Sequence, residues 1–300
     1  MVKLKTTKRE RNIFIISIVV PIIALYILFY IFPCIRGLYM SLFRWRGISM
    51  NMHFVGLKNF VDLFQDRDFL KSLYNNLYIF LFTSVLLFIF SIFFAVILSK
   101  DILPERNVYR TIFFFPAAVP MVVVGIIAMS VYAPTNGILN TFLDAIGLGA
   151  LKQLWFSNRY LVKPSLITFL VWKVLGFYMV LMIASIQNIP TELYESAVID
   201  GAGTWQQTVK ITLPLIWEVV RTALVFFIIS SFAASFAIIF MTTHGGPDRA
   251  SEVLVTYMYE NAFSFSKFGY GTAIGVMILV ITLILALVLL RTTEREVVQY

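Results

Sequence analysis

The sequence predicts an all-α, polytopic membrane protein that crosses the bilayer about six times. Hydrophobic residues make up 60% of the chain and charged residues only 13%, about half the charged share of a typical soluble domain. Six apolar stretches reach the length of about 20 residues that is needed to cross the hydrocarbon core. They must be helical, because lipid cannot satisfy open backbone polar groups. The predicted spans are residues 13–33, 75–98, 112–133, 164–186, 219–241 and 271–290.

The same composition excludes several other classes of protein. A disordered chain would be poor in apolar residues, and the single cysteine, Cys34, excludes an intramolecular disulfide framework and a multi-thiolate metal site. Two histidines, His53 and His244, leave little with which to build a zinc enzyme. The net charge of +8 would suit a protein that binds nucleic acid. Basic residues that flank membrane spans and face anionic lipid explain this charge better. We therefore expect lipid as a partner, and no nucleic acid, catalytic residue or metal site.

Two of the stretches carry features that change their interpretation. The first follows a basic tail, as a signal peptide would, but its apolar run exceeds the usual length of about 7–15 residues and no A-x-A-like site follows, so we predict a retained span. The third contains Pro116 and Pro120, which should kink it. The basic residues of the tail are Lys3, Lys5, Lys8, Arg9 and Arg11.

The distribution of positive charge favours a cytoplasmic N-terminus. In this orientation the cytoplasmic segments hold 12 basic residues and the external segments 11, so the positive-inside rule does not decide by count. Five of the basic residues, however, lie in the first 11 positions, close to the first span. Because six spans put both termini on one side, residues 1–12 and 291–300 are predicted cytoplasmic tails around a membrane domain of residues 13–290.

The connection at residues 188–214 is predicted to form two short helices joined by a turn. Pro190 suits a first helical turn, Gly201 suits the end of that helix, and Thr204 with Gln207 has the spacing of a capping box for the second helix, which should end at Leu213–Pro214. In the first helix, one face carries Leu193, Tyr194, Ala197 and Val198, and the acidic side chains lie away from it. From these features alone, an amphipathic connector on the membrane surface is the simplest interpretation.

This connection resembles the cytoplasmic loop of the integral membrane permeases of binding-protein-dependent ABC importers. The family pattern is E-A-A-x3-G-x9-I-x-L-P. This chain has Glu195-Ser196-Ala197, then Gly201, then Ile211-Thr212-Leu213-Pro214 at the same spacing. Six of seven fixed positions match, and Ser196 replaces the first alanine. The resemblance implies a helix-turn-helix that couples the membrane domain to an ATPase and lies in the cytoplasm.

Three shorter segments resemble the carbohydrate-importing branch of that family. They are Phe54–Phe60 (F-x-G-L-x-N-[YF]), Gly137–Asn140 (G-[LI]-[LI]-N) and Thr243–Pro247 (T-x-G-G-P), in the family's order and on the predicted outer side. One position departs, because many relatives carry Phe-Asp where this chain has Phe236-Ala237. That departure leaves the identity of the transported sugar open.

The resemblance also implies which partners the chain needs. No G-x4-G-K-[ST] phosphate loop is present in the sequence, so ATP and Mg would be used by two separate ATPase subunits and no cofactor would be bound by this chain. An extracellular or periplasmic substrate-binding protein would deliver the solute, and a second, different permease subunit would complete a core in the bacterial cell membrane. The coupling residues that the resemblance implies are Glu192, Glu195, Ser196, Ala197, Asp200, Gly201, Gly203, Ile211, Leu213 and Pro214.

Candidate residues for the substrate path lie in the fourth and fifth spans. Lys173 is the one deeply placed charge, and an intramembrane charge is a candidate for function, although a lysine can also snorkel to the interface or fill a water-lined gap. The hydroxyls of the fifth span can contact a sugar or simply allow close helix packing. The predicted path residues are Lys173, Tyr178, Ser230, Ser231, Ser235 and Phe236.

Other functions fit the sequence less well. A secondary transporter or channel would need charged or broken-helix ion sites in several spans, and an intramembrane enzyme would need a readable nucleophile, base or metal set. Among importers, one for a polyol or a glycerol phosphate-type solute is the alternative to a sugar permease. The sequence does not separate these substrates.

Overall fold

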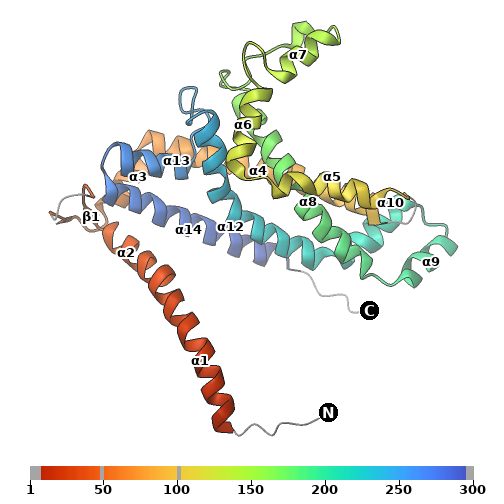
Figure 1. Cartoon of the computed structure of the whole chain (residues 1–300), viewed down its shortest axis with the longest axis horizontal. Coiled ribbons are helices and arrows are strands. Elements are labelled where there is room, and N and C mark those ends of the chain that lie inside the picture. The colour runs from red at the N-terminus through yellow and green to blue at the C-terminus, as the bar shows by residue number, and fades with distance from the viewer. Residues whose placement is uncertain (1–7, 48–50, 100–102, 295–300) are drawn as a thin grey trace. The chain divides into compact units, whose positions relative to one another are not determined.

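The computed structural model describes residues 8–47, 51–99 and 103–294 (Figure 1). Its predominantly helical structure confirms the predicted all-α class. Among the described residues, five helices are long and apolar enough to cross a membrane, and a bent helix pair makes up to six. Lys3, Lys5 and the outer ends of both predicted tails lie outside the described residues. The chain divides into two compact units, residues 1–63 with 258–277 and residues 64–257 with 278–300.

The first unit begins with one continuous helical run, Lys8–Met40, in which the candidate membrane span Asn12–Met40 is longer than the predicted span 13–33. It comprises α1 (Lys8–Tyr26), the π-helical turn η1 (Ile27–Ile31) and α2 (Phe32–Met40). Pro33 lies two residues after the π-helical turn η1 and does not end this run, although a proline inside a helix removes one backbone hydrogen bond. No residue in the most apolar window of this run is buried within the chain.

In the rest of the first unit, two short strands pair with each other and one of them lies against the start of α14. The strands β1 (Phe43–Arg44) and β2 (His53–Phe54) pair antiparallel, and α3 (Lys58–Gln65) follows them. The chain returns to this unit at the end of α13 (Leu254–Tyr259), passes through η4 (Glu260–Ser264) and leaves it within α14 (Phe268–Thr292). Gly269 of α14 lies against the β1 backbone, since a Cβ added there would be 1.9 Å from the carbonyl oxygen of Phe43.

The second unit is built on the pair α4 (Arg67–Ser99) and α8 (Val162–Gln187), its largest helix contact. α12 (Trp217–Thr242) packs against both. The buried side of α4 repeats at helical spacing, for example at Leu87, Ser91 and Ala95. Its other faces carry exposed large apolar side chains, as expected for a helix that faces lipid.

The third predicted span is broken rather than straight. α5 (Arg106–Ala118) and α6 (Met121–Val131) meet at an angle of 101°, a turn that is plain in Figure 1. The break lies at Val119, which is extended, and at Pro120, which precedes the first residue of α6. A residue before proline is disfavoured in the α conformation, so the sharp bend follows from Pro120, whereas Pro116 stays inside α5.

The connection at residues 188–214 contains both predicted helices, but the predicted capping box is wrong. α9 (Thr191–Ile199) begins after Pro190, and the chain turns at Gly201, whose φ is +78°. α10 (Thr204–Gln207) begins after Gly203, whose N–H donates to Oε1 of Gln206 at 3.0 Å. The capping glutamine is therefore Gln206, because the helix starts one residue earlier than the Thr204–Gln207 pattern requires.

The predicted end of the second short helix is also wrong. Helical structure continues through the π-helical η3 (Thr208–Thr212) and α11 (Leu213–Leu215), and after Ile216 it enters α12. Pro214 lies two residues after the end of η3 and does not end the helical structure. The connection is thus joined to α12 by almost unbroken helix.

Candidate functional site

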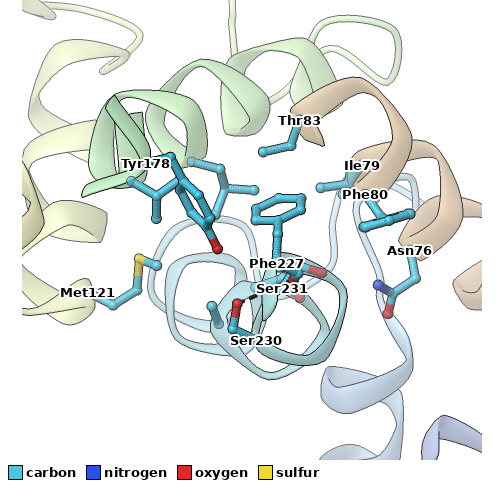
Figure 2. Close-up of a pocket in the computed structure, with 13 residues that line it drawn as sticks. Asn76, Ile79, Phe80, Thr83, Met121, Tyr178, Phe227, Ser230 and Ser231 are labelled. Carbon is cyan, nitrogen blue, oxygen red and sulfur yellow. Dashed lines mark hydrogen bonds between the residues drawn. The ribbon is translucent and has the colours of Figure 1, made fainter. Parts of the chain in front are cut away.

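A small cavity lies among α4, α6, α8 and α12 of the second unit (Figure 2). Its volume of about 50 Å³ holds only a few water molecules. Of the described residues that line it, none is charged, and apolar side chains surround a group of hydroxyl and carboxamide side chains. This polar group consists of Asn76, Thr83, Tyr178, Ser230, Ser231 and Ser235.

The serines of α12 present acceptor atoms to this cavity. Ser230, Ser231 and Ser235 each donate their O–H to a carbonyl of their own helix, at 3.2, 3.2 and 3.1 Å. Their oxygen lone pairs then remain available as acceptors. Figure 2 shows the phenol oxygen of Tyr178 directed toward the turn of α12 that carries Ser230.

Aromatic rings form a second part of the lining. The rings of Phe80 and Phe227 are stacked with centroids 5.8 Å apart, and Tyr178 meets Phe227 edge to face at 5.9 Å. Such pairs are stabilising and geometrically specific. The cavity therefore combines flat apolar faces with hydroxyl groups.

Thr83 and Asn76 of α4 line the same cavity in different states of hydrogen bonding. The Thr83 residue is 3% exposed, and its Oγ1 has no hydrogen-bond partner within the described chain. The side-chain oxygen of Asn76 accepts from the N–H of Leu254 at 3.2 Å. A buried hydroxyl without a partner is rare and costly, and Thr83 therefore offers a donor and an acceptor to whatever enters the cavity.

The structure brings four of the six predicted path residues together. Tyr178, Ser230, Ser231 and Ser235 line the cavity, whereas Lys173 and Phe236 do not. Phe236 stacks on Phe240 with ring centroids 5.2 Å apart.

Sequence reasoning missed the contribution of α4. Asn76 and Thr83 are seven residues apart, which places them on one helical face. This spacing of polar residues inside an apolar stretch is the signal that could have found them.

Lys173 has a role that the sequence did not suggest. Its ammonium donates to the carbonyl oxygen of Ala117, in the last turn of α5, at 2.6 Å. Two arginines behave in the same way, since Arg110 donates to Leu98 O at the end of α4 and Arg221 to Leu290 O near the end of α14. Cations at helix C-termini satisfy free carbonyls and interact favourably with the helix dipole.

The loop after α12, which contains Thr243–Pro247, is fastened to the start of α4. Asn75 donates to the carbonyls of Arg249 and Glu252 at 2.9 and 3.0 Å, and its own oxygen accepts from Lys163 at 3.2 Å. Arg249 also pairs with Asp68 at 3.1 Å.

The asparagines of the motif segments Phe54–Phe60 and Gly137–Asn140 also form side-chain hydrogen bonds to neighbouring segments. Asn59 donates to the carbonyls of Ser41 and Phe43. Asn140, on α7 (Ile138–Ala145), bonds Gln153 O at 3.0 Å and the indole N–H of Trp155 at 2.9 Å, beyond the short helix η2 (Gly149–Leu151).

The connection at residues 188–214 has one attached face and one free face. Leu193 and Tyr194 pack against a buried cluster that includes Met182 and Ile216, and the Tyr194 hydroxyl bonds that of Thr212 at 3.0 Å.

The free face carries both apolar and acidic side chains. Ile199 is 86% exposed and Trp205 is 78% exposed. Val198, predicted on the same helical face as Leu193 and Tyr194, is instead 62% exposed. The reason is that α9 contacts the buried cluster only through its first turns. Among the predicted coupling residues, Ala197, Ile211 and Leu213 are half-buried, and the exposed ones are Glu192, Glu195, Ser196, Asp200, Gly201, Gly203 and Pro214.

Comparison with known proteins places these features in a family. Residues 104–295 match the family described as binding-protein-dependent transport system inner membrane component. The probable ABC transporter permease protein YurN of Bacillus subtilis is 37% identical, with 89% of this chain and 91% of that protein covered. The diacetylchitobiose uptake system permease protein NgcF of Streptomyces coelicolor is 35% identical, with 94% and 82% covered.

A solved structure shares the fold over nearly the whole chain. It is a bacterial alginate ABC transporter in complex with an alginate pentasaccharide-bound periplasmic protein. One of its chains matches with a TM-score of 0.83 at 25% identity, and 96% of each chain is covered.

The two polar residues that α4 gives to the cavity should respond differently to truncation. Asn76→Ala leaves the buried N–H of Leu254 without its acceptor, so we expect the free energy of unfolding to fall by about 1–3 kcal/mol. Thr83→Val removes a hydroxyl that has no partner and should leave stability unchanged or slightly raised. Thermal unfolding in detergent measures both, and a Thr83→Val loss as large as that of Asn76→Ala would show that the hydroxyl is already bonded.

Proposed function

Because this chain belongs to the family of binding-protein-dependent transport system inner membrane components, we propose that it forms the translocation path of an ATP-driven importer for an uncharged sugar or oligosaccharide. The observation that carries this substrate class is the cavity, in which hydroxyls and aromatic rings lie together and no lining residue of the described chain is charged. The chain is a transport subunit and not an enzyme.

The chemistry of the lining favours a neutral solute. A sugar ring presents hydroxyls at its rim and C–H groups on its faces, which match the serine and tyrosine hydroxyls and the rings of Phe80 and Phe227. A phosphate or carboxylate would need a cationic partner, because a charge taken out of water without one is costly. Lys173, the nearest candidate from sequence, bonds to Ala117 O instead. The glycerol phosphate alternative is therefore disfavoured.

The cavity is too small to hold a sugar as it stands. At about 50 Å³ it accommodates only water, so passage requires the helices to separate in an alternating-access cycle. We assign the remaining wall of the path to a second, different permease subunit.

Energy would come from two ATPase subunits that use ATP and Mg. We propose that they contact the free face of the 188–214 connection, where Ile199 and Trp205 are exposed beside the acidic side chains. Exposed aromatic and apolar side chains of this kind are typical interface anchors. The solute would be delivered by an extracellular or periplasmic binding protein on the opposite side of the membrane. In this proposed arrangement, the 188–214 connection and both termini would lie in the cytoplasm of a bacterial cell.

Uptake into proteoliposomes tests the substrate class. The chain is reconstituted with its partner subunits and internal ATP, and its binding protein is added outside. We expect uptake of a neutral oligosaccharide such as diacetylchitobiose and none of sn-glycerol 3-phosphate. Tyr178→Phe should lower sugar uptake about 2- to 10-fold, the value of one neutral hydrogen bond. Tyr109→Phe, at an exposed position, is the matched control. Equal uptake of both solutes would contradict the proposal.

Two variants of the connection test the coupling role. Gly201→Trp should leave the protein inserted and stop transport, because a Cβ at position 201 meets nothing within 4 Å in this chain, and the bulky ring would then obstruct only a partner. Glu195→Lys, which reverses an exposed charge in the middle of α9, should do the same. Gly201→Asn is the control, since asparagine tolerates positive φ. Normal transport and normal ATPase binding by both variants would contradict the coupling role of the 188–214 connection.

Cysteine labelling tests the orientation. In a Cys34→Ser background, which removes the single cysteine of the chain, Glu195→Cys should react with an impermeant maleimide only after the cells are opened. Ser266→Cys should react in intact cells. Labelling of position 195 from outside would reverse the topology.

A further inference from the structure

The break between α5 and α6 lies directly behind the cavity wall. Met121, the first residue of α6, lines the cavity, and so does Val174 of α8. Lys173, the neighbour of Val174, does not line it. The ammonium of Lys173 contacts the end of α5 at Ala117 O without lining the cavity.

The break removes the ordinary partner of a backbone carbonyl. In an unbroken helix, Ala117 O would accept from the N–H of residue 121, but Met121 begins a helix that points 101° away. Pro120 has no N–H to donate to Pro116 O. The N–H of Val119 donates to that carbonyl instead, at 3.1 Å. Ala117 O accepts from Lys173 Nζ at 2.6 Å, so the lysine supplies the hydrogen bond that the bend has removed.

A second contact holds α5 against α8 one turn away. A Cβ at Gly176 would be 2.0 Å from the carbonyl oxygen of Phe113 and 2.5 Å from Cα of Phe114. The backbones of α5 and α8 are in contact there, and only glycine, which has no Cβ, fits at this position. The end of α5 is thus attached to α8 at two points, by backbone contact at Gly176 and by the ammonium of Lys173.

We propose that Lys173 is a positioning residue that fixes the angle of the α5–α6 break and thereby the place of Met121 in the cavity wall. This inference rests on the proposed function in one respect only, that the cavity belongs to the transport path. Lys173 acts on transport through Ala117 and Met121, without touching the solute.

Transport kinetics and a labelling measurement test this together. Lys173→Met keeps the length of the side chain and removes the donor, and we expect the maximal transport rate to fall by at least about 10-fold, as for loss of a charged hydrogen bond, with little change in KM. Lys173→Arg, which keeps a charged donor, should restore most of the rate. Lys173→Leu, which also removes the donor, replaces Lys173→Met if that variant does not fold.

The labelling arm reports on position rather than on stability. In the Cys34→Ser background, a cysteine at Met121 should change its rate of reaction with a small maleimide at least several-fold when Lys173→Met is added. A cysteine at Ala234, which lines the cavity from α12, should react at an unchanged rate. A general loosening of the fold would change both.

Two results would overturn the inference. The first is a raised KM with an unchanged maximal rate and no rescue by arginine, which would make Lys173 a direct ligand of the solute. The second is an unchanged labelling rate at position 121. Failure of the proposed substrate class is seen separately, in the parental protein, because the labelling rates require no solute.

Discussion

The structure depends on satisfying backbone carbonyls at helix ends inside an apolar protein. The last carbonyls of a helix have no partner in the helix itself, and lipid offers none. Basic side chains supply the missing donors in this chain, with Arg110 at the end of α4, Lys173 at the end of α5 and Arg221 near the end of α14. The indole N–H of Trp217 does the same for Thr293 O at 2.9 Å. These bonds decide which helix ends lie together.

Asparagine has the complementary role in the loops. Asn59, Asn75 and Asn140 each use the carboxamide N–H to hold carbonyls of a segment distant in sequence. A carboxamide provides two donors and an acceptor without a net charge, which suits positions where a charge would need a partner. Two of the short motifs found in the sequence contain one of these residues, so the motifs have a structural reason as well as a family resemblance.

The 188–214 connection and the cavity are linked by helix that is interrupted only at Ile216. Tyr194 ties α9 to Thr212 in η3, and η3 leads through α11 into α12, which carries Ser230 and its neighbours. Under the proposed coupling role, a displacement of the connection would therefore act on α12. Because packed interiors transmit strain rather than absorb it, this path suits a subunit that converts movement at one end of a helix into rearrangement of a cavity at the other.

The helical class, the apolar spans and the two short helices of the connection were predictable from sequence, because apolar length, proline and glycine act over a few neighbouring residues. The sequence also singled out Tyr178 and the three serines of α12, because hydroxyls are conspicuous in an apolar stretch, and these residues line one cavity. The start of α10 was misplaced by one residue, because Gln206 and Gln207 are adjacent and only the backbone geometry chooses between them. The hydrogen bond from Lys173 to Ala117 O and the place of Thr83 in the cavity were decided by tertiary structure alone. Helix rotation sets which side chain meets which neighbour, and that rotation results from packing between segments that are far apart in the chain.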